Sequence, residues 1–356
     1  MARIAFYSNN MVERGTPVAL YDYAVQSEAL LGHESVVLYD RGFPGNNPQV
    51  IQKFAARFDL IPCDGFTDVD AHLKAQACDL LYVIKSGKRD DLIARDVPTM
   101  AHAVFATTTR QVHGAAYAYV SEWLSQHCSA GRVPWVPHMV QIGQTDADMR
   151  AELGIPTDAL VFGCYGGAES FDIPFVKTQV IPQVLETRQD VWFIFMNITA
   201  FADHTRLRFL PGTADLEAKT AFINTCDAML HARARGETFG LAVGEFSLRR
   251  KPVLTFGGSK ETAHLGMLGA AAQVYHTPQA LYDLIDGFDR AAPSSREAYL
   301  SQFAPAPVMQ RFADHLITPA RKGGLNGARD RLGWRRWDPL LMARPKLRKL
   351  MRGIGG

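Results

Sequence analysis

The chain has 356 residues, of which 47% are hydrophobic and 21% charged, a composition typical of a globular protein that excludes a long disordered chain. This length exceeds what one hydrophobic core usually serves, so about two domains are expected. The apolar runs are far shorter than the roughly 20 residues of a membrane-spanning helix, and the N-terminus turns polar too early for a signal peptide. We therefore expect a cytoplasmic protein.

The net charge of +2 hides an asymmetry along the chain. Residues 320–356 contain 11 Lys or Arg and two Asp, so the remainder of the chain is acidic and the tail is basic. The five cysteines are scattered without a CxxC pair. Neither a disulfide framework nor a zinc site is indicated by this spacing, and we interpret the cysteines as core residues.

In residues 1–145, short apolar segments rich in β-branched and aromatic residues alternate with stretches of helix length. Runs of this kind predict strands buried on both faces of a parallel α/β sheet. The predicted strands read RIAFYS, SVVLYD, LLYVIK, MAHAVF, AYAYVS and VPWVPH. Residues 146–157 are polar and punctuated by Gly and Pro, which is typical of a linker.

The same alternation restarts in residues 158–319, with ALVFGCYGG, VWFIFMNI, RLRFLPG, DAMLHAR, PVLTFGG and AQVYHT as predicted strands. The sequence thus predicts two doubly wound parallel-sheet domains followed by a basic tail, 320–356. Such domains bind ligands outside the carboxyl ends of their strands, here in the gap between the two domains.

The loop after the first strand leads into a helix of about 15 residues, with Thr16 as N-cap, Pro17 at the first helical position and Gly32 just past the end. Gly15 and Thr16 would then lie at a helix N-terminus, which attracts an anion or a sugar hydroxyl. Equally, these two residues could serve only as turn and cap.

Three histidines of the first half are candidate functional residues. His102 lies inside an apolar strand, where a histidine is either a core residue or a catalyst. His113 and His138 lie beside Gly and Pro in loops and are weaker candidates. Gly167 belongs to a Gly-Gly pair after a strand, a geometry that lets backbone approach a phosphate, although the Lys-Ser/Thr of a P-loop is missing.

The segment 235–256, RGETFGLAVGEFSLRRKPVLTF, contains two glutamates eight residues apart. Thr238 can cap a helix that continues until Pro252 starts the next strand. Eight residues advance a helix by about 800°, so Glu237 and Glu245 can face one side, with Glu237 at the carboxyl edge of the sheet. The alternative is that two glutamates have this spacing by chance.

The segment ETFGLAVGE, followed by KPVL, resembles the E-x7-E motif of the retaining glycosyltransferases of family four, which have the GT-B fold of two Rossmann-like domains. The order of YVSEWL, LGIP, VFGCYGG, RFLPG and the motif agrees over roughly residues 1–315. The resemblance implies that Glu245 binds the nucleotide ribose and that Glu237 is a catalytic residue near the donor sugar. It also implies a catalytic His102, with His113 as runner-up, and donor contacts from Gly15, Thr16, Gly167, Pro211, Gly212, Thr213, Phe239, Gly240 and Leu241.

One departure from the family concerns the diphosphate. The family usually has an Arg and a Lys after the first strand of the second domain, whereas this chain reads GGAESFDIPFVK there. Lys177 is the nearby cation in this segment, and Arg14, Arg249 or Lys260 would have to substitute.

The sequence therefore predicts a retaining glycosyltransferase that moves a sugar from a nucleoside diphosphate sugar to a hydroxyl of a carbohydrate or lipid-linked glycan, in glycan or polysaccharide synthesis. No DxD-like pair stands at a suitable loop, so we expect neither a metal nor a cofactor in the transfer, and no nucleic-acid partner. The alternatives are an epimerase or phosphorylase of GT-B architecture, or a non-catalytic nucleotide-sugar-binding protein. The basic tail is expected to contact an anionic membrane surface, to be solvated, or to pack back onto the first domain.

Overall fold

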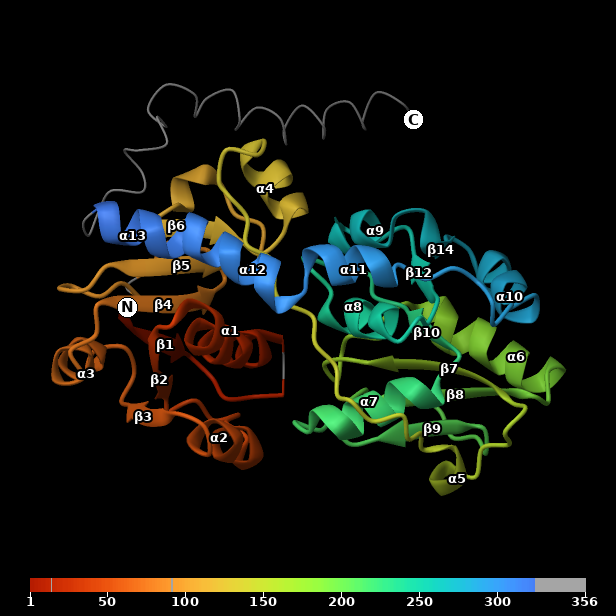
Figure 1. Cartoon of the computed structure of the whole chain (residues 1–356). Coiled ribbons are helices and arrows are strands. Elements are labelled where there is room, and N and C mark those ends of the chain that lie inside the picture. The colour runs from red at the N-terminus through yellow and green to blue at the C-terminus, as the bar shows by residue number, and fades with distance from the viewer. Residues whose placement is uncertain (14, 91, 324–356) are drawn as a thin grey trace.

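The structure is a computed structural model that describes residues 1–13, 15–90 and 92–323 (Figure 1). Arg14 and most of the predicted basic tail, residues 324–356, lie outside the described residues. The described chain forms two α/β domains that lie side by side. Between residues 1 and 323, leaving out 14 and 91, no helix has both the length and the hydropathy needed to cross a bilayer.

The first domain contains a six-stranded sheet of order β3-β2-β1-β4-β5-β6, in which every paired strand is parallel. Helices pack against it because the strands are apolar on both faces. The elements are β1 Arg3–Ser8, α1 Gly15–Leu31, β2 Glu34–Asp40, α2 Pro48–Ala55, β3 Asp59–Cys63, α3 Val69–Ala75, β4 Leu80–Lys85, β5 Thr99–Ala103, the 3₁₀ turn Thr109–Gln111, β6 Ala116–Tyr119 and α4 Glu122–Ser129.

The second domain contains another parallel six-stranded sheet, of order β14-β12-β10-β7-β8-β9. Its elements are α5 Arg150–Leu153, β7 Leu160–Tyr165, the π-helix Val176–Val180, α6 Ile181–Thr187, β8 Val191–Met196, β9 Leu207–Leu210, α7 Leu216–Thr225, β10 Ala228–His231, β11 Gly236–Glu237, α8 Leu241–Leu248, β12 Val253–Phe256, β13 Glu261–Thr262, α9 Ala263–Leu268, the 3₁₀ turn Gly269–Ala271, β14 Ala272–Tyr275 and α10 Pro278–Asp286.

The prediction of two parallel α/β sheets is confirmed, with two differences in the first domain. Strand β3 was not predicted, because its sequence, DLIPC, is short, polar at its start and interrupted by Pro62. A proline is tolerated there because β3 lies at the edge of the sheet. Conversely, the predicted strand VPWVPH is not one: Trp135 makes only an isolated bridge to Tyr119.

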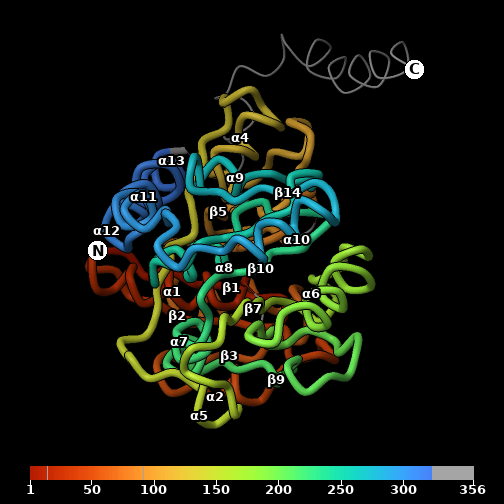
Figure 2. Tube along the Cα trace, turned by 90° about the vertical axis from the view of Figure 1, so that its right-hand side faces the viewer, coloured from red at the N-terminus to blue at the C-terminus, as the bar shows by residue number. Residues whose placement is uncertain are grey.

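After α10 the chain returns to the first domain. The second domain therefore ends before residue 319, where the sequence predicted its boundary. This return segment contains α11 Arg296–Gln302, α12 Pro305–Phe312, the π-helix Ala313–Ile317 and α13 Thr318–Gly323. Helix α12 packs on α1, and Figure 2 shows these blue helices lying over the red N-terminal helix. The side chains that join the first domain's main core are Tyr299, Phe303, Val308, Met309, Phe312, Leu316, Ile317 and Ala320.

Candidate functional site

Glu237 lies at the carboxyl edge of the second sheet but not on a helix. It forms the two-residue strand β11, which pairs with β13, and helix α8 begins only at Leu241. The predicted cap Thr238 is therefore wrong: the N-cap is Gly240, whose φ of 98° lies in the left-handed region that favours glycine. Gly236 has a φ of 76°, and a Cβ there would collide with the Glu261 carbonyl. These two glycines let the chain turn sharply on either side of Glu237.

One oxygen of the Glu237 carboxylate is held by two neighbours. Oε1 accepts a hydrogen bond from Arg233 at 2.6 Å and contacts His231 Nε2 at 3.5 Å. Burial opposes ionisation of this carboxyl, but the hydrogen bonds and charges of His231 and Arg233 outweigh it and lower its pKa to about 2. Within the described part of the chain, Oε2 has no hydrogen-bond partner, and the partly buried Glu237 side chain is 21% exposed. Glu237 is therefore an ionised carboxylate with one oxygen fixed and the other open to a ligand.

A buried polar chain extends behind Glu237. His231 Nδ1 lies 2.9 Å from the Thr255 hydroxyl, which lies 3.1 Å from His264 Nε2. Burial is the main cause that lowers the pKa of His264 to about 3. The Thr255 hydroxyl thus lies within hydrogen-bond distance of both imidazoles and links His264 to His231. These contacts hold the His231 ring in its orientation toward the Glu237 carboxylate.

Glu245 lies in a different environment, so the two glutamates do not share one face of a helix. Its side chain is 4% exposed, and Oε1 accepts a hydrogen bond from Lys219 of α7 at 2.7 Å. Burial and the charge of Asp22, on α1 of the first domain, raise the pKa of Glu245. Its second oxygen, Oε2, is buried and has no hydrogen-bond partner among the described residues. A buried carboxylate oxygen without a donor is costly, and a ligand hydroxyl would satisfy it.

The start of α8 contacts the first domain directly. The Phe239 ring lies 5.3 Å from that of His138 and belongs to the main core of the first domain. A Cβ on Gly15 would lie 3.3 Å from Leu241 Cδ1. Helix α1 begins at Gly15, two residues before the predicted first helical residue Pro17, so Thr16 is inside the helix and is not its cap. Gly15, Phe239 and Leu241 thus lie where the two domains join, and the donor contacts that the resemblance implies for them stay a prediction.

His102 is a core residue in this structure. Its side chain is fully buried, with Nδ1 2.7 Å from the Tyr82 hydroxyl and Nε2 2.8 Å from the Val136 carbonyl. Burial lowers its pKa to about 4, so the ring is neutral near pH 7. Because both ring nitrogens are occupied, this geometry does not support the predicted catalytic role. The runner-up, His113, is also buried and contacts Lys85 at 2.9 Å.

The loop after β9 also approaches the first domain. A Cβ on Gly212 would lie 2.5 Å from Glu13 Oε2, so this glycine allows a close contact between the domains. Pro211 is exposed, and the Thr213 hydroxyl accepts the Asp215 N–H at 3.0 Å, at the start of α7. The three residues border the interface, and their proposed contact with the nucleotide base stays a prediction.

The predicted phosphate-binding cations lie apart from one another. Arg249 is the C-cap of α8, at the opposite end from Gly240, and its guanidinium bonds Asn224 and the linker residue Asp146. This placement contradicts the prediction that Arg249 assists the diphosphate. Lys177 lies 6.0 Å from the Phe201 ring centre. Gly167 follows β7, and a Cβ there would meet nothing within 4 Å, so its backbone is open to a ligand.

Sequence reasoning missed several residues around the two glutamates. His231, Arg233, Thr255 and His264 surround Glu237, and Lys219 pairs with Glu245. Arg233 had a local signal, because it lies four residues before Glu237 at a strand end. His231 ends the preceding strand, whereas Thr255, His264 and Lys219 come from other elements, so no local pattern pointed to those three.

No protein-family model and no curated protein matches the chain. Among solved structures, HepE from Anabaena in complex with UDP-glucose is 15% identical, with a TM-score of 0.65 over 88% of this chain and 99% of that one. A glycosyltransferase from Rickettsia africae is 11% identical, with a TM-score of 0.66 over 90% and 99% of the two chains. A protein described as a UDP-N-acetylglucosamine 2-epimerase, from Listeria monocytogenes, is 12% identical, with a TM-score of 0.54 over 87% and 94%.

Identities this low show a shared fold rather than a shared reaction. The similarities extend over both domains and nearly the whole length of each solved structure. Together with the two parallel six-stranded sheets, they confirm the predicted GT-B fold of two Rossmann-like domains.

Proposed function

We propose that this protein is a glycosyltransferase of the retaining class that transfers a sugar from a nucleoside diphosphate sugar to an acceptor hydroxyl. The observation that carries the proposal is the Glu237 carboxylate, ionised, held by Oε1 and open at Oε2. It lies next to Gly240, where a Cβ would approach the Glu237 Cβ to 3.3 Å, and so beside the N-terminus of α8. The solved complex of HepE with UDP-glucose, which has the same fold, supports a nucleotide-sugar donor.

In the proposed complex, the two glutamates have separate tasks. The open oxygen of Glu237 contacts the donor sugar, where its negative charge favours the positive charge that develops at the anomeric carbon. The unpartnered Oε2 of Glu245 accepts a hydrogen bond from a ribose hydroxyl. The free N–H groups at the start of α8 bind the diphosphate, and Arg233 supplies a nearby positive charge.

The reaction breaks the bond between the anomeric carbon and the diphosphate oxygen, and forms a bond from that carbon to the acceptor oxygen on the same face. The acceptor proton goes to the departing diphosphate. No cofactor or metal is needed in this scheme, because helix dipole and guanidinium stabilise the leaving group. An anion at the start of α8 is favoured there by the orientation of the peptide dipoles.

The test is Glu237→Gln, assayed for transfer with the donor found by a thermal-shift screen of UDP-, GDP-, ADP- and CDP-sugars. Loss of a charged hydrogen bond costs about 1.5–3 kcal/mol, which lowers kcat/KM about 10- to 150-fold. Glu261→Gln is the matched control, because Glu261 also pairs with an arginine, Arg235, one strand away. A folded Glu237→Gln variant with unchanged turnover would refute the proposal.

An epimerase is the second candidate, because a protein described as a UDP-N-acetylglucosamine 2-epimerase shares the fold. An epimerase converts the donor sugar without an acceptor, whereas a transferase needs one. Analysis of the products with and without acceptors therefore separates the two. Donor binding without either product would favour a non-catalytic nucleotide-sugar-binding protein.

A further inference from the structure

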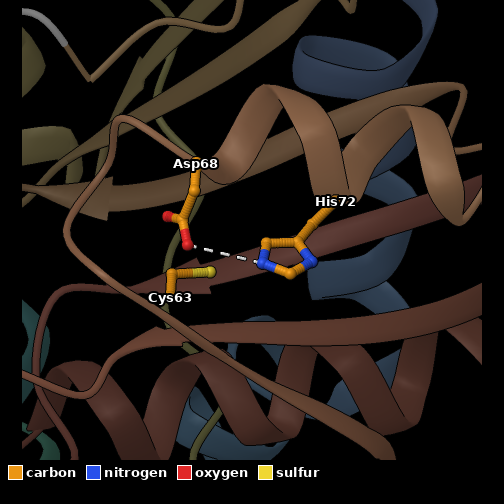
Figure 3. A group of neighbouring side chains, drawn as sticks. All are labelled: Cys63, Asp68 and His72. Atoms are coloured by element: carbon orange, nitrogen blue, oxygen red, sulfur yellow. Dashed lines mark ion pairs between the residues drawn. The ribbon is translucent and has the colours of Figure 1, made fainter.

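Three side chains with metal-binding atoms converge at the outer edge of the first domain. Cys63 ends the edge strand β3, Asp68 is the N-cap residue of α3, and His72 lies one helical turn later. Their ligand atoms all lie within 4.8 Å of one another, and Asp68 Oδ2 is 3.5 Å from His72 Nε2. Figure 3 shows the sulfur of Cys63 beside the line that joins the carboxylate and the imidazole.

The local fold holds these groups in place. Asp68 and His72 are four residues apart and therefore share one side of the first turn of α3. The Asp64 N–H donates to Asp68 Oδ2 at 3.0 Å and so orients the carboxylate. The Oδ1 atom of Asp68 is buried and has no hydrogen-bond partner in residues 1–323, leaving out 14 and 91. Figure 3 shows that the other oxygen, Oδ2, is the one on the side of Cys63 and His72.

The surroundings of the thiol also favour a cation. Cys63 is fully buried, and its sulfur makes a long contact, 3.8 Å, with the Ile61 carbonyl. The neighbouring strand places Asp40 opposite Cys63 in the sheet register. The nearby Arg41 is paired with Asp64. The site thus brings a second acidic residue close to the three ligand-type groups.

We propose that Cys63, Asp68 and His72 form a zinc-binding site. A thiolate, an imidazole and a carboxylate together suit Zn²⁺, whereas Mg²⁺ and Ca²⁺ prefer oxygen ligands alone. Bonds of about 2.0–2.3 Å to a tetrahedral ion would place the ligand atoms roughly 3.5 Å apart, so small side-chain rotations would complete the site. Three protein ligands leave the fourth position to water, and the ion would tie β3 to α3.

The site was not expected from the sequence, because the spacing Cys-x4-Asp-x3-His is not a familiar zinc pattern. Helix α3 lies at the end of the first domain that faces away from the second domain (Figure 1). The proposed metal is therefore structural and independent of the glycosyl transfer, so either proposal can fail alone.

The test uses the full chain without a histidine tag, stripped with a chelator and titrated with Zn²⁺ by calorimetry and with Co²⁺ by visible absorption. We expect one equivalent of each metal, a cobalt–thiolate absorption band, and a higher melting temperature with Zn²⁺. Cys63→Ser should abolish the thiolate band, and Asp68→Asn and His72→Gln should weaken Zn²⁺ binding at least about tenfold.

Cys78→Ser is the matched control, because Cys78 is another buried cysteine of the same small core but lies outside the cluster. It should bind both metals as the unaltered chain does. Less than one equivalent of Zn²⁺ on the unaltered chain would overturn the proposal. So would unchanged Zn²⁺ affinity in folded His72→Gln, a half-exposed position where a folding defect is not expected.

Discussion

The buried imidazole of His102 should make this protein less stable in mild acid. Its pKa is lowered from 6.5 to about 4 in the folded chain, because burial disfavours the charged ring. Between these two values, the unfolded chain binds the proton and the folded chain does not. Stability linked to this group is therefore present above about pH 6.5 and is lost as the pH falls toward 4.

The magnitude follows from the two pKa values. Moving from pH 7 to pH 5 should cost about 2 kcal/mol of unfolding free energy through His102 alone. His102→Gln removes the titrating ring but can still donate to the Val136 carbonyl. This variant should be less stable at pH 7 by about 1–3 kcal/mol, because the Tyr82 hydroxyl loses its acceptor, and its stability should fall less steeply with acid.

The assay is urea unfolding at pH 7, 6 and 5, with His276→Gln as control because that histidine lies at the surface. The control should keep the full pH dependence. If His102→Gln keeps the full dependence as well, and also loses transferase activity while remaining folded, then His102 acts on the substrate and the structural interpretation is wrong.

Three further perturbations test the site. Thr255→Val should lower the unfolding free energy by about 1–3 kcal/mol, because two buried imidazoles lose their shared hydroxyl. Thr255→Ser keeps the hydroxyl and should not lower it. Equal losses of stability in the two variants, measured by thermal unfolding, would contradict the hydrogen-bonded series from His264 to His231. Lys219→Met should destabilise by about 3–5 kcal/mol, because the buried Glu245 then loses its cation and still faces the charge of Asp22. Glu245→Gln should destabilise by less, because Lys219 keeps the opposite charge of Asp22 nearby, and the reverse order in urea unfolding would refute this reasoning. Gly240→Ala should cost about 1–3 kcal/mol through its φ of 98° and weaken donor binding by calorimetry, and an unchanged affinity would remove α8 from the donor site.

The sequence alone determined the two parallel sheets, because the alternation of apolar strands and helices is a local signal that survives without tertiary information. All six predicted strands of the second domain are present. The position of Glu237 at the carboxyl edge of the sheet could also be predicted, because a strand end and two nearby glycines indicate a turn there. The edge strand β3 could not be predicted, because it is a strand through its pairing with β2 and not through its own composition.

Only the tertiary structure decided which side chains meet. Glu237 is ionised because His231, at the end of β10, and Arg233, just after β10, both contact its carboxylate. Thr255 and His264, which lie behind His231, come from later elements of the chain. Nor does a linear sequence show that Arg249 lies at the far end of α8, or that both nitrogens of His102 are occupied. Motifs and periodicity report the local conformation of the chain. Burial and charge, which set the pKa of each group, depend on neighbours that folding brings together from distant positions.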